Sequence, residues 1–471
     1  MRKRSLLAAA VAAACFAGGA HATNWFQLQG TEPNGTASPY HLFGFIQPTY
    51  QDSGGTAVSG LQGAAAPFNG AVPKFNEVAP QDTSMSSFNM LRARIGVRGT
   101  VLPISNKIDY FIMAEFGNNN FTYGNGSYTP RLTDASVTFN EIPGMRVRVG
   151  LFKTPGPEED LQGIPDFNYI NFTNVSAQLI QNQFIGTNLA VAETGVSGAY
   201  AVQAAPTDAG RDQGIQLFDW FNNGPWQFAY AAMIGNGAPL YANAQSNSAS
   251  YYGRIQESYI FHHSKGPHQA GITAWVWDHL GHQDLDVSTA GTTTGGFTRQ
   301  SYTFKRYGLG AQYRSGFMTP GAVRVTGELM RGTGWILAPA AFAAPYGTTG
   351  GCVVGSPLCN ETLYPGANNA AVGGYVETGV FVTKHLDLEA RYDQYNRMTN
   401  NPGLERIFKT TTLGVQYYIS PMARVTLNYA INRIDVPHLS DVTGGAVGQA
   451  NASAIASAKD DTIALQTTLI F

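Results

Sequence analysis

The chain has 471 residues, of which 13% are charged and 12% aromatic, with 54 glycines and a formal net charge of −2. Soluble globular chains carry roughly a quarter charged residues, so an ordinary cytosolic enzyme is disfavoured. The mean hydropathy is −0.13, and beyond residue 22 no apolar run approaches the ~20 residues of a spanning helix. These values exclude a bundle of membrane helices and indicate alternating β-strands. The mild net charge gives no indication of a nucleic-acid partner.

The N-terminus has the three parts of a secretory signal peptide. Basic residues occupy 2–4, an apolar run covers 6–17, and Ala20-His21-Ala22 is an A-x-A cleavage site. We therefore expect residues 1–22 to be removed, leaving residues 23–471 as one exported domain. A lipoprotein anchored through Cys15 is the weaker alternative, because the leader before that residue is short.

Two cysteines, Cys352 and Cys359, remain after the signal peptide. An even pair in an exported chain predicts a disulfide that closes a loop. Half of a metal site is the competing interpretation, and it lacks a nearby histidine or further cysteine.

A period-two pattern recurs along the whole chain. In residues 88–100, Leu91, Ala93, Ile95 and Val97 alternate with Arg92, Arg94, Gly96 and Arg98. The same alternation returns at 145–151, 306–313, 388–393 and 424–431. Charges at every second position suit a water-filled lumen with lipid on the opposite face.

Sixteen segments follow this pattern, with lengths close to the ~9–11 residues of a tilted spanning strand. An even number of strands is expected of a bacterial outer-membrane barrel. The expected strands are 40–50, 88–101, 107–117, 131–140, 145–153, 211–220, 226–235, 251–261, 268–278, 303–315, 321–331, 371–383, 386–396, 408–419, 422–433 and 461–471.

The connections between these strands alternate between short turns and long loops. The long ones are 51–87, 118–130, 154–210, 236–250, 279–302, 332–370, 397–407 and 434–460. Short periplasmic turns and long extracellular loops are typical of outer-membrane barrels. The hydrophobic last strand, which ends on Phe471, must pair with the first because lipid cannot satisfy an open sheet edge. The fold class predicted is an all-β, transmembrane, antiparallel β-barrel in the outer membrane of a Gram-negative bacterium.

Several segments resemble the phosphate-selective porin O and P family between about residues 88 and 471. They are Leu91–Gly99, Val147–Lys153, Arg211–Leu217, Gly374–Gly379, Glu389–Asp393 and Thr412–Tyr418 with Asn428 and Tyr429. The resemblance implies a sixteen-stranded porin, usually a homotrimer, whose third extracellular loop folds into the pore. That loop corresponds to 154–210 here.

The alternation places a set of basic residues on the lumenal face. Arginine is a permanently charged, multidentate donor suited to carboxylates and phosphates. The candidate pore-lining and selectivity residues are Arg92, Arg94, Arg98, Arg146, Arg148, Lys153, Arg306, Arg324, Arg391 and Arg424. The alternative is that some of them only pair with lumenal acids, namely Glu115, Glu328, Glu377, Glu389 and Asp393.

The expected constriction loop departs from the family pattern, which is rich in basic residues there. This loop carries Glu158, Glu159, Asp160 and Asp166. Acids opposite an arginine-rich wall set up a transverse field, as in general porins. We therefore expect a pore for passive diffusion of small inorganic or organic ions with a modest anion preference, and no true phosphate specificity. The aromatic residues near Tyr169 have two interpretations, loop packing or an apolar rail for bulkier solutes.

Two other classes of function have less support. An outer-membrane hydrolase needs a nucleophile and base, and the histidines, including His262 and His268, lack a G-x-S-x-G context. The spacing of His279 and His282 suits a surface metal, although a solvated loop is the simpler interpretation. A surface adhesin, or a barrel that sheathes a partner protein, stays open. No cofactor motif is present, so none is expected.

Overall fold

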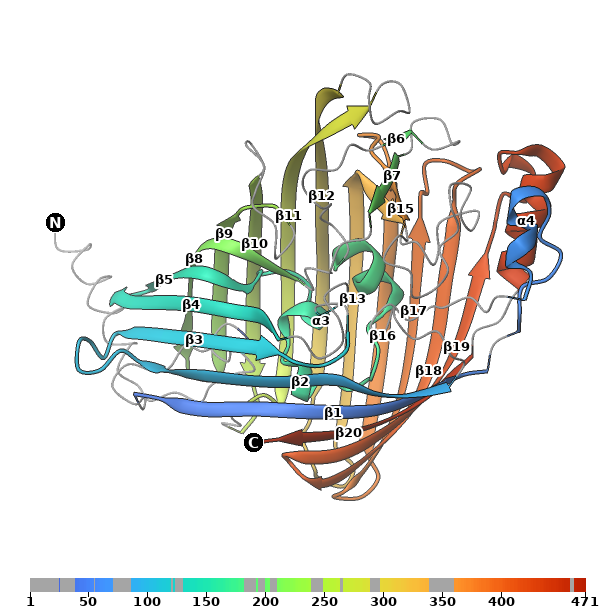
Figure 1. Cartoon of the computed structure of the whole chain (residues 1–471). Coiled ribbons are helices and arrows are strands. Elements are labelled where there is room, and N and C mark those ends of the chain that lie inside the picture. The colour runs from blue at the N-terminus through green and yellow to red at the C-terminus, as the bar shows by residue number, and fades with distance from the viewer. Residues whose placement is uncertain are drawn as a thin grey trace.

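The computed structural model describes residues 25, 39–54, 56–70, 86–119, 122, 130–181, 192–193, 200–203, 210–238, 249–262, 266–288, 297–338, 360–457 and 461–471. Sixteen strands form a closed barrel in which each strand pairs antiparallel with its neighbour along the chain. The first strand, β1, closes on the last, β20, with Phe45 opposite Ile470. Figure 1 shows these two strands side by side at the front of the barrel. The predicted signal peptide and the predicted Cys352–Cys359 disulfide lie outside the described residues.

All sixteen predicted strands are present in the predicted order, which confirms the fold class. The barrel strands are β1 His41–Ser53, β2 Ser86–Thr100, β3 Ile108–Glu115, β4 Arg131–Ile142, β5 Met145–Lys153, β8 Arg211–Asn223, β9 Trp226–Gly235, β10 Ala249–Ile260, β11 Gly271–Ser288, β12 Phe297–Arg314, β13 Val323–Gly334, β16 Ala370–Phe381, β17 Leu386–Arg397, β18 Arg406–Ser420, β19 Ala423–Asp435 and β20 Thr462–Ile470.

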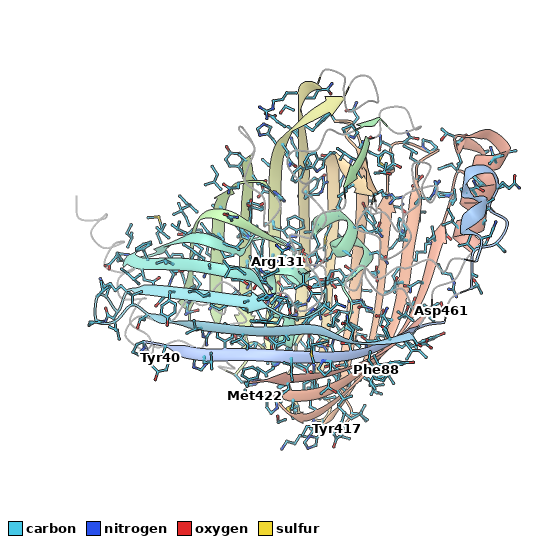
Figure 2. All side chains as sticks on the ribbon, viewed as in Figure 1. Tyr40, Phe88, Arg131, Tyr417, Met422 and Asp461 are labelled. Carbon is cyan, nitrogen blue, oxygen red and sulfur yellow. The ribbon has the colours of Figure 1, made fainter. Side chains whose placement is uncertain are left out.

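The two faces of the barrel are inverted in polarity relative to a soluble protein. Ile95, Leu309 and Tyr417 expose 48%, 57% and 52% of their side chains on the outside, whereas their polar neighbours are buried inside. Side chains such as Tyr417 and Phe88 project from the outer surface in Figure 2. A sheet with an apolar outer face and a charged inner face is stable only when lipid surrounds it.

One residue departs from the predicted alternation. Leu91 was expected on the lipid face, but it is 2% exposed and packs inside against Ile170 and Ala464. The register between β1 and β2 shifts at this point, since Gln47 opposes Arg92 while Pro48 opposes Met90. Proline has no N–H to donate to the ladder, and a β-bulge accommodates it by leaving one residue unpaired. That residue is Leu91, and the bulge turns it inward.

The connection predicted at 279–302 is wrong in extent, because β11 and β12 continue well beyond the other strands (Figure 1). His279 and His282 therefore lie within β11 rather than in a solvated loop. Residues three apart on a strand point to opposite faces, so these two histidines do not converge on one metal ion.

The long connections contain elements that period-two patterning did not predict. The third connection contains α3 Glu158–Leu161, η2 Ile164–Asp166 and η3 Ser176–Ile180. The last one contains η4 Leu439–Asp441 and α4 Gly445–Ser457. The first contains η1 Gly63–Phe68, which packs beside α4 through a bond from the Gln62 N–H to Asn451 Oδ1 of 2.7 Å. No helix in the described part of the chain is long and apolar enough to cross a membrane.

Two connections meet in a second, four-stranded sheet. Its strands are β14 Ile336–Ala338, β15 Asn360–Tyr364, β7 Tyr200–Gln203 and β6 Ala192–Glu193, in that order. The end of the third connection is thus joined to the sixth. The two short strands of the third connection, β6 and β7, therefore belong to this sheet and not to the barrel.

Candidate functional site in the barrel lumen

Residues 154–181 of the third connection lie inside the barrel. Almost all of them are buried, and Figure 1 shows α3 enclosed by the strands. Val175, Leu179 and Ile180 pack with Trp277 and Tyr375 from the inner wall. This contact covers one side of the lumen with a hydrophobic layer.

Arginines from five strands fix this segment by donating to its backbone carbonyl oxygens. Loop carbonyls have no intrinsic partner when they are buried, and each unsatisfied one is costly. The five bonds run from Arg254 to Gly156 (2.8 Å), Arg424 to Phe167 (2.6 Å), Arg92 to Ile170 (3.4 Å), Arg391 to Asn171 (2.9 Å) and Arg306 to Leu179 (3.3 Å). Four of these arginines were predicted to line the pore, and their guanidinium groups hold the loop.

The acidic residues of the loop make specific contacts as well. Glu158 accepts from Arg254 Nη2 at 2.6 Å and from Trp25 Nε1 at 2.5 Å. Glu159 accepts from Arg391 Nη1 at 3.2 Å. Both carboxylates are buried, so they act mainly as anchors against the wall. At these two positions, ion pairs with Arg254 and Arg391 compensate the negative charge that the predicted transverse field would use.

The two further loop acids are Asp160, which is buried, and Asp166, which lines the cavity described below. Asp160 accepts from Gln181 Nε2 at 2.6 Å, and burial raises its pKa to about 6 against the opposing effect of that bond and of Lys153. Asp166 Oδ1 lies 3.3 Å from His268 Nε2. Burial likewise raises the pKa of Asp166 to about 6, opposed by Arg424 and Arg314. The pKa of His268 is held well below its usual value by burial and by nearby arginines.

A buried carboxylate on β13 holds the start of α3. Glu328 Oε1 accepts from Trp275 Nε1 and Trp277 Nε1, each at 2.8 Å. Its Oε2 accepts from Tyr375 Oη at 3.2 Å and from the Glu158 N–H at 3.1 Å. Glu328 joins three barrel strands to the loop through these four donors.

Glycines make room for the two tryptophans of this cage. A Cβ added at Gly310 would lie 2.5 Å from Trp275 Cζ2, and one at Gly308 would lie 2.8 Å from Trp277. Real Cβ contacts are essentially never that close. The absent side chains on β12 therefore allow both indoles to lie along the wall.

Four of the other predicted basic residues have partners along the wall. Arg94 binds Glu115 at 2.7 Å, and Arg146 binds Asp219 at 3.1 Å. Arg324 forms ion pairs with both Asp387 and Glu389. Arg148 donates to Thr138 Oγ1 at 3.2 Å and lies over the Phe218 ring. All ten predicted basic side chains point inward.

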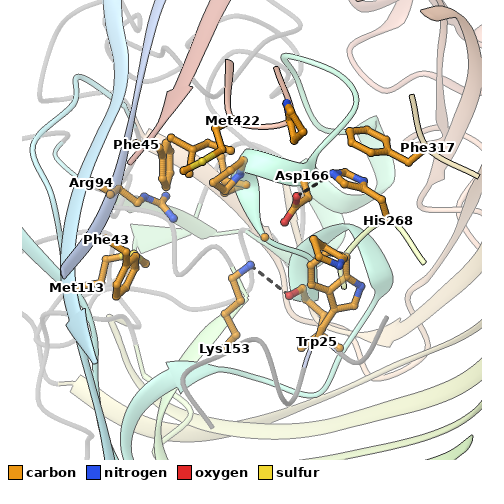
Figure 3. Close-up of a pocket in the computed structure, with 18 of the residues that line it drawn as sticks. Trp25, Phe43, Phe45, Arg94, Met113, Lys153, Asp166, His268, Phe317 and Met422 are labelled. Carbon is orange, nitrogen blue, oxygen red and sulfur yellow. Dashed lines mark hydrogen bonds and ion pairs between the residues drawn. The ribbon is translucent and has the colours of Figure 1, made fainter. Parts of the chain in front are cut away.

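A cavity of about 940 Å³ lies between the loop and the short-turn end of the barrel. Its described lining comes from Trp25, from β1–β5 and the start of β8, from the loop at 161–166, and from the turns that carry His268, Phe317 and Met422. Figure 3 shows Arg94 and Lys153 directed into this space, with Trp25, Asp166 and His268 across from them. Lys153 also donates to the carbonyl oxygens of Gln162 and Leu161 at 2.5 and 3.4 Å.

Sequence reasoning missed one of the five arginines that hold the loop, Arg254, which donates to Gly156, Glu158 and Gln256. The signal was present, because Tyr252, Arg254 and Gln256 share the inward face of β10. It also missed the lumenal aromatics Phe43 and Phe45. The described residues contain no group of three or more His, Cys, Asp or Glu side chains placed to hold a metal ion.

No protein-family model and no curated protein matches the chain. Among solved structures, the anion-selective porin from Comamonas acidovorans aligns with a TM-score of 0.50 and 12% identity, over 92% of this chain and 100% of its own. The outer membrane channel DcaP of Acinetobacter baumannii aligns at 0.49 and 11%, over 94% and 99%. The Salmonella typhi OmpF complex with daunomycin aligns at 0.47 and 12%, over 92% and 97%. At such identities the likeness shows the fold alone: the chain has a porin-type barrel.

Proposed function

We propose that the chain forms a water-filled channel in the outer membrane of a Gram-negative bacterium, through which small solutes and ions diffuse passively with a modest preference for anions. The observation that carries the proposal is the polarity of the closed barrel, apolar outside and charged inside. In such a barrel the backbone N–H and C=O groups of every strand are hydrogen-bonded to a neighbouring strand, as lipid requires, while the interior stays polar. The packed loop narrows that interior, which sets a size limit for solutes.

The charge of the cavity supports the anion preference. Its described lining has four basic side chains, Arg94, Arg98, Lys153 and Arg211, and two acidic ones, Asp134 and Asp166. A surplus of fixed positive charge in a narrow, low-dielectric passage concentrates anions and repels cations. Nothing in this lining selects phosphate over other anions, so phosphate specificity is not part of the proposal.

Planar-bilayer recording tests the proposal directly. The purified protein is expected to give stepwise conductance. Its reversal potential in a KCl gradient is expected to be displaced from zero toward the equilibrium potential of chloride. A reversal potential on the potassium side would overturn the anion preference. Liposome swelling with sugars of increasing size tests the channel itself, because a barrel that serves only as an adhesin or a sheath passes none of them.

We also propose that residues 1–22 are a cleaved signal peptide, that Cys352 and Cys359 form a disulfide, and that the mature chain assembles as a homotrimer. Intact-mass measurement of protein from outer membranes is expected to give a chain beginning at Thr23. Alkylation before and after reduction is expected to label both cysteines only after reduction. Light scattering in detergent distinguishes a trimer from a monomer.

A further inference from the structure

The lumenal cavity combines cations with aromatic rings, which a pore for inorganic ions does not need. Six described lining residues are aromatic: Trp25, Phe43, Phe45, Phe111, Phe261 and Phe317. Phe43, Phe111 and Phe317 are only half-buried, so part of each ring surface faces the cavity. Apolar surface exposed in a wetted passage costs hydration free energy, which an apolar ligand surface would recover.

The rings and the cations are interleaved on the same wall. Arg94 lies over the Phe45 ring at 5.7 Å, and Arg98 lies over the Phe43 ring at 5.8 Å. Phe43 in turn contacts Phe111, with ring centroids 5.2 Å apart. A molecule that contacts these half-buried rings therefore lies next to the guanidinium groups of Arg94 and Arg98.

The cavity cations differ in how far their charge is compensated. Arg94 and Arg211 each bind a carboxylate, Glu115 and Asp134 respectively. Lys153 donates to two backbone carbonyls, whose dipoles do not cancel a full charge. Its neighbours Arg211 and Arg94 add to the positive potential around it, and Asp134 and Asp160 oppose them. A carboxylate entering the cavity would meet this potential near Lys153.

We propose that this cavity binds an organic anion made of one aromatic ring and one carboxylate, the benzoate class, with the ring against Phe43 and Phe111 and the carboxylate toward Lys153 and Arg98. The inference rests on the proposed channel and names the solute class that its narrow part favours. The volume of about 940 Å³ is at the upper end of small-molecule sites, which span roughly 300–1,000 Å³. The ring is therefore held loosely, and loose binding allows passage.

Competition with chloride current tests the inference in the intact channel. Benzoate, acetate and the neutral isostere benzamide are added in turn on each side of the bilayer while chloride conductance is recorded. Benzoate is expected to halve the current at a concentration about fivefold lower than acetate, because of ring burial and cation contact together. Benzamide is expected to have no effect. Equal potency of benzoate and acetate, or block by benzamide, would overturn the proposed site.

Substitution separates the ring contact from the charge. In Phe43→Leu and Phe111→Leu, the ratio of benzoate to acetate potency is expected to fall toward one. In Lys153→Met, both anions are expected to lose potency together. The control is Phe228→Leu, since Phe228 lies on the outer face with 41% exposure, and it is expected to behave as the unchanged protein. An unchanged ratio in both phenylalanine variants would refute the ring contact.

A binding measurement in detergent keeps this inference distinct from the channel proposal. Saturation-transfer NMR is expected to show benzoate ring protons in contact with the folded barrel, and Phe43→Leu is expected to weaken the signal. Circular dichroism checks that each variant is folded. Absence of chloride current would refute the channel, whereas normal current without benzoate contact would refute only the site.

Discussion

Two walls of the lumen carry arginine, and they use it differently. On β13–β17, carboxylates balance the charge: Arg324 pairs with Asp387 and Glu389, and Arg391 pairs with Glu159 of the loop. On β1–β2, Arg94 pairs with a carboxylate, that of Glu115 on β3. Arg92 binds the amide of Gln47 at 3.0 Å, and Arg98 lies over the Phe43 ring. An amide leaves the positive charge of Arg92 in place, whereas a carboxylate compensates the charge of its arginine partner.

The two walls differ in charge compensation, although both anchor the loop, since Arg92 of β2 also donates to Ile170. On the acid-rich wall the charges are compensated in buried ion pairs, one of which, between Arg391 and Glu159, also fixes the loop. The acid-poor wall keeps a positive potential beside the cavity, and that potential acts on passing ions. Replacing an arginine by glutamine should therefore lower stability on the β13–β17 wall and change ion selectivity on the β1–β2 wall.

The largest expected effect is on the acid-rich wall. Arg324→Gln leaves Asp387 and Glu389 without their shared cation, and removing one partner of a buried pair costs about 3–5 kcal/mol. Urea unfolding in lipid vesicles, followed by tryptophan fluorescence, measures the loss. Lys409→Gln is the control, because Lys409 and Asp435 form an exposed pair and such pairs contribute less than ~1 kcal/mol. Equal losses in the two variants would contradict a structural role for Arg324.

The next effect concerns the cage of Glu328. In Glu328→Gln, the amide nitrogen cannot accept from the donors that now meet the carboxylate, which costs about 1–3 kcal/mol for the unsatisfied groups. The start of α3 then loses its anchor, and single-channel records are expected to show larger current fluctuation. Glu257→Gln, on the outer face, should leave the current noise unchanged. Quiet records from Glu328→Gln would mean that the arginine bonds alone fix the loop.

A substitution at Gly310 tests the same cage by steric crowding of Trp275. Gly310→Val forces Trp275 away from Glu328, and overpacking of this kind costs about 1–3 kcal/mol. The expected result is increased current noise with a smaller stability loss than in Arg324→Gln. Gly327→Ala is the matched control on the adjacent strand, since its Cβ would lie an ordinary 3.4 Å from the nearest atom. Noise of equal size in both glycine variants would contradict the steric explanation.

The features that could be predicted from the sequence are those that depend on local periodicity. Whether a side chain points inward is a period-two property, and Arg306 and Leu309 follow it to opposite faces. A single proline in the partner strand was enough to turn Leu91 inward. Phe43 and Phe45 were missed because both faces of β1 carry apolar residues there, so polarity does not distinguish them. The bonds of Arg391 and Arg424 to loop carbonyls have no sequence period at all, since they depend on contacts more than 200 residues apart.

On the acid-poor wall, selectivity should change without a large loss of stability. Arg98→Gln removes one positive charge from the cavity lining and is expected to lower the chloride-to-potassium permeability ratio by roughly twofold. The reversal potential in a KCl gradient measures the change. Arg331→Gln removes the same charge from an exposed outer position and should leave the ratio unchanged. If Arg98→Gln also left it unchanged, Arg98 would be a purely structural residue.

The smallest expected effect is a pH dependence that arises from the loop. The pKa of Asp166 is raised to about 6 by burial, so its carboxylate is mostly ionised at pH 7 and mostly neutral at pH 5. Protonation removes a negative charge from the cavity lining, and the anion preference is therefore expected to rise as the pH falls through 6. His268 does not add to this trend by ionising in the same range, because its pKa is held well below 6.5 by burial and nearby arginines.

Asp160 titrates in the same range, with a pKa of about 6, so variants separate the two contributions. Asp166→Asn at pH 7 is expected to show part of the selectivity that the unchanged protein reaches at pH 5, and its remaining pH dependence comes from other groups, Asp160 among them. Asp441→Asn, in an exposed loop, should keep the full pH dependence. A reversal potential that stayed constant between pH 7 and pH 5 would mean that neither carboxylate contributes to the field in the pore. Selectivity would then depend on the β1–β2 wall alone.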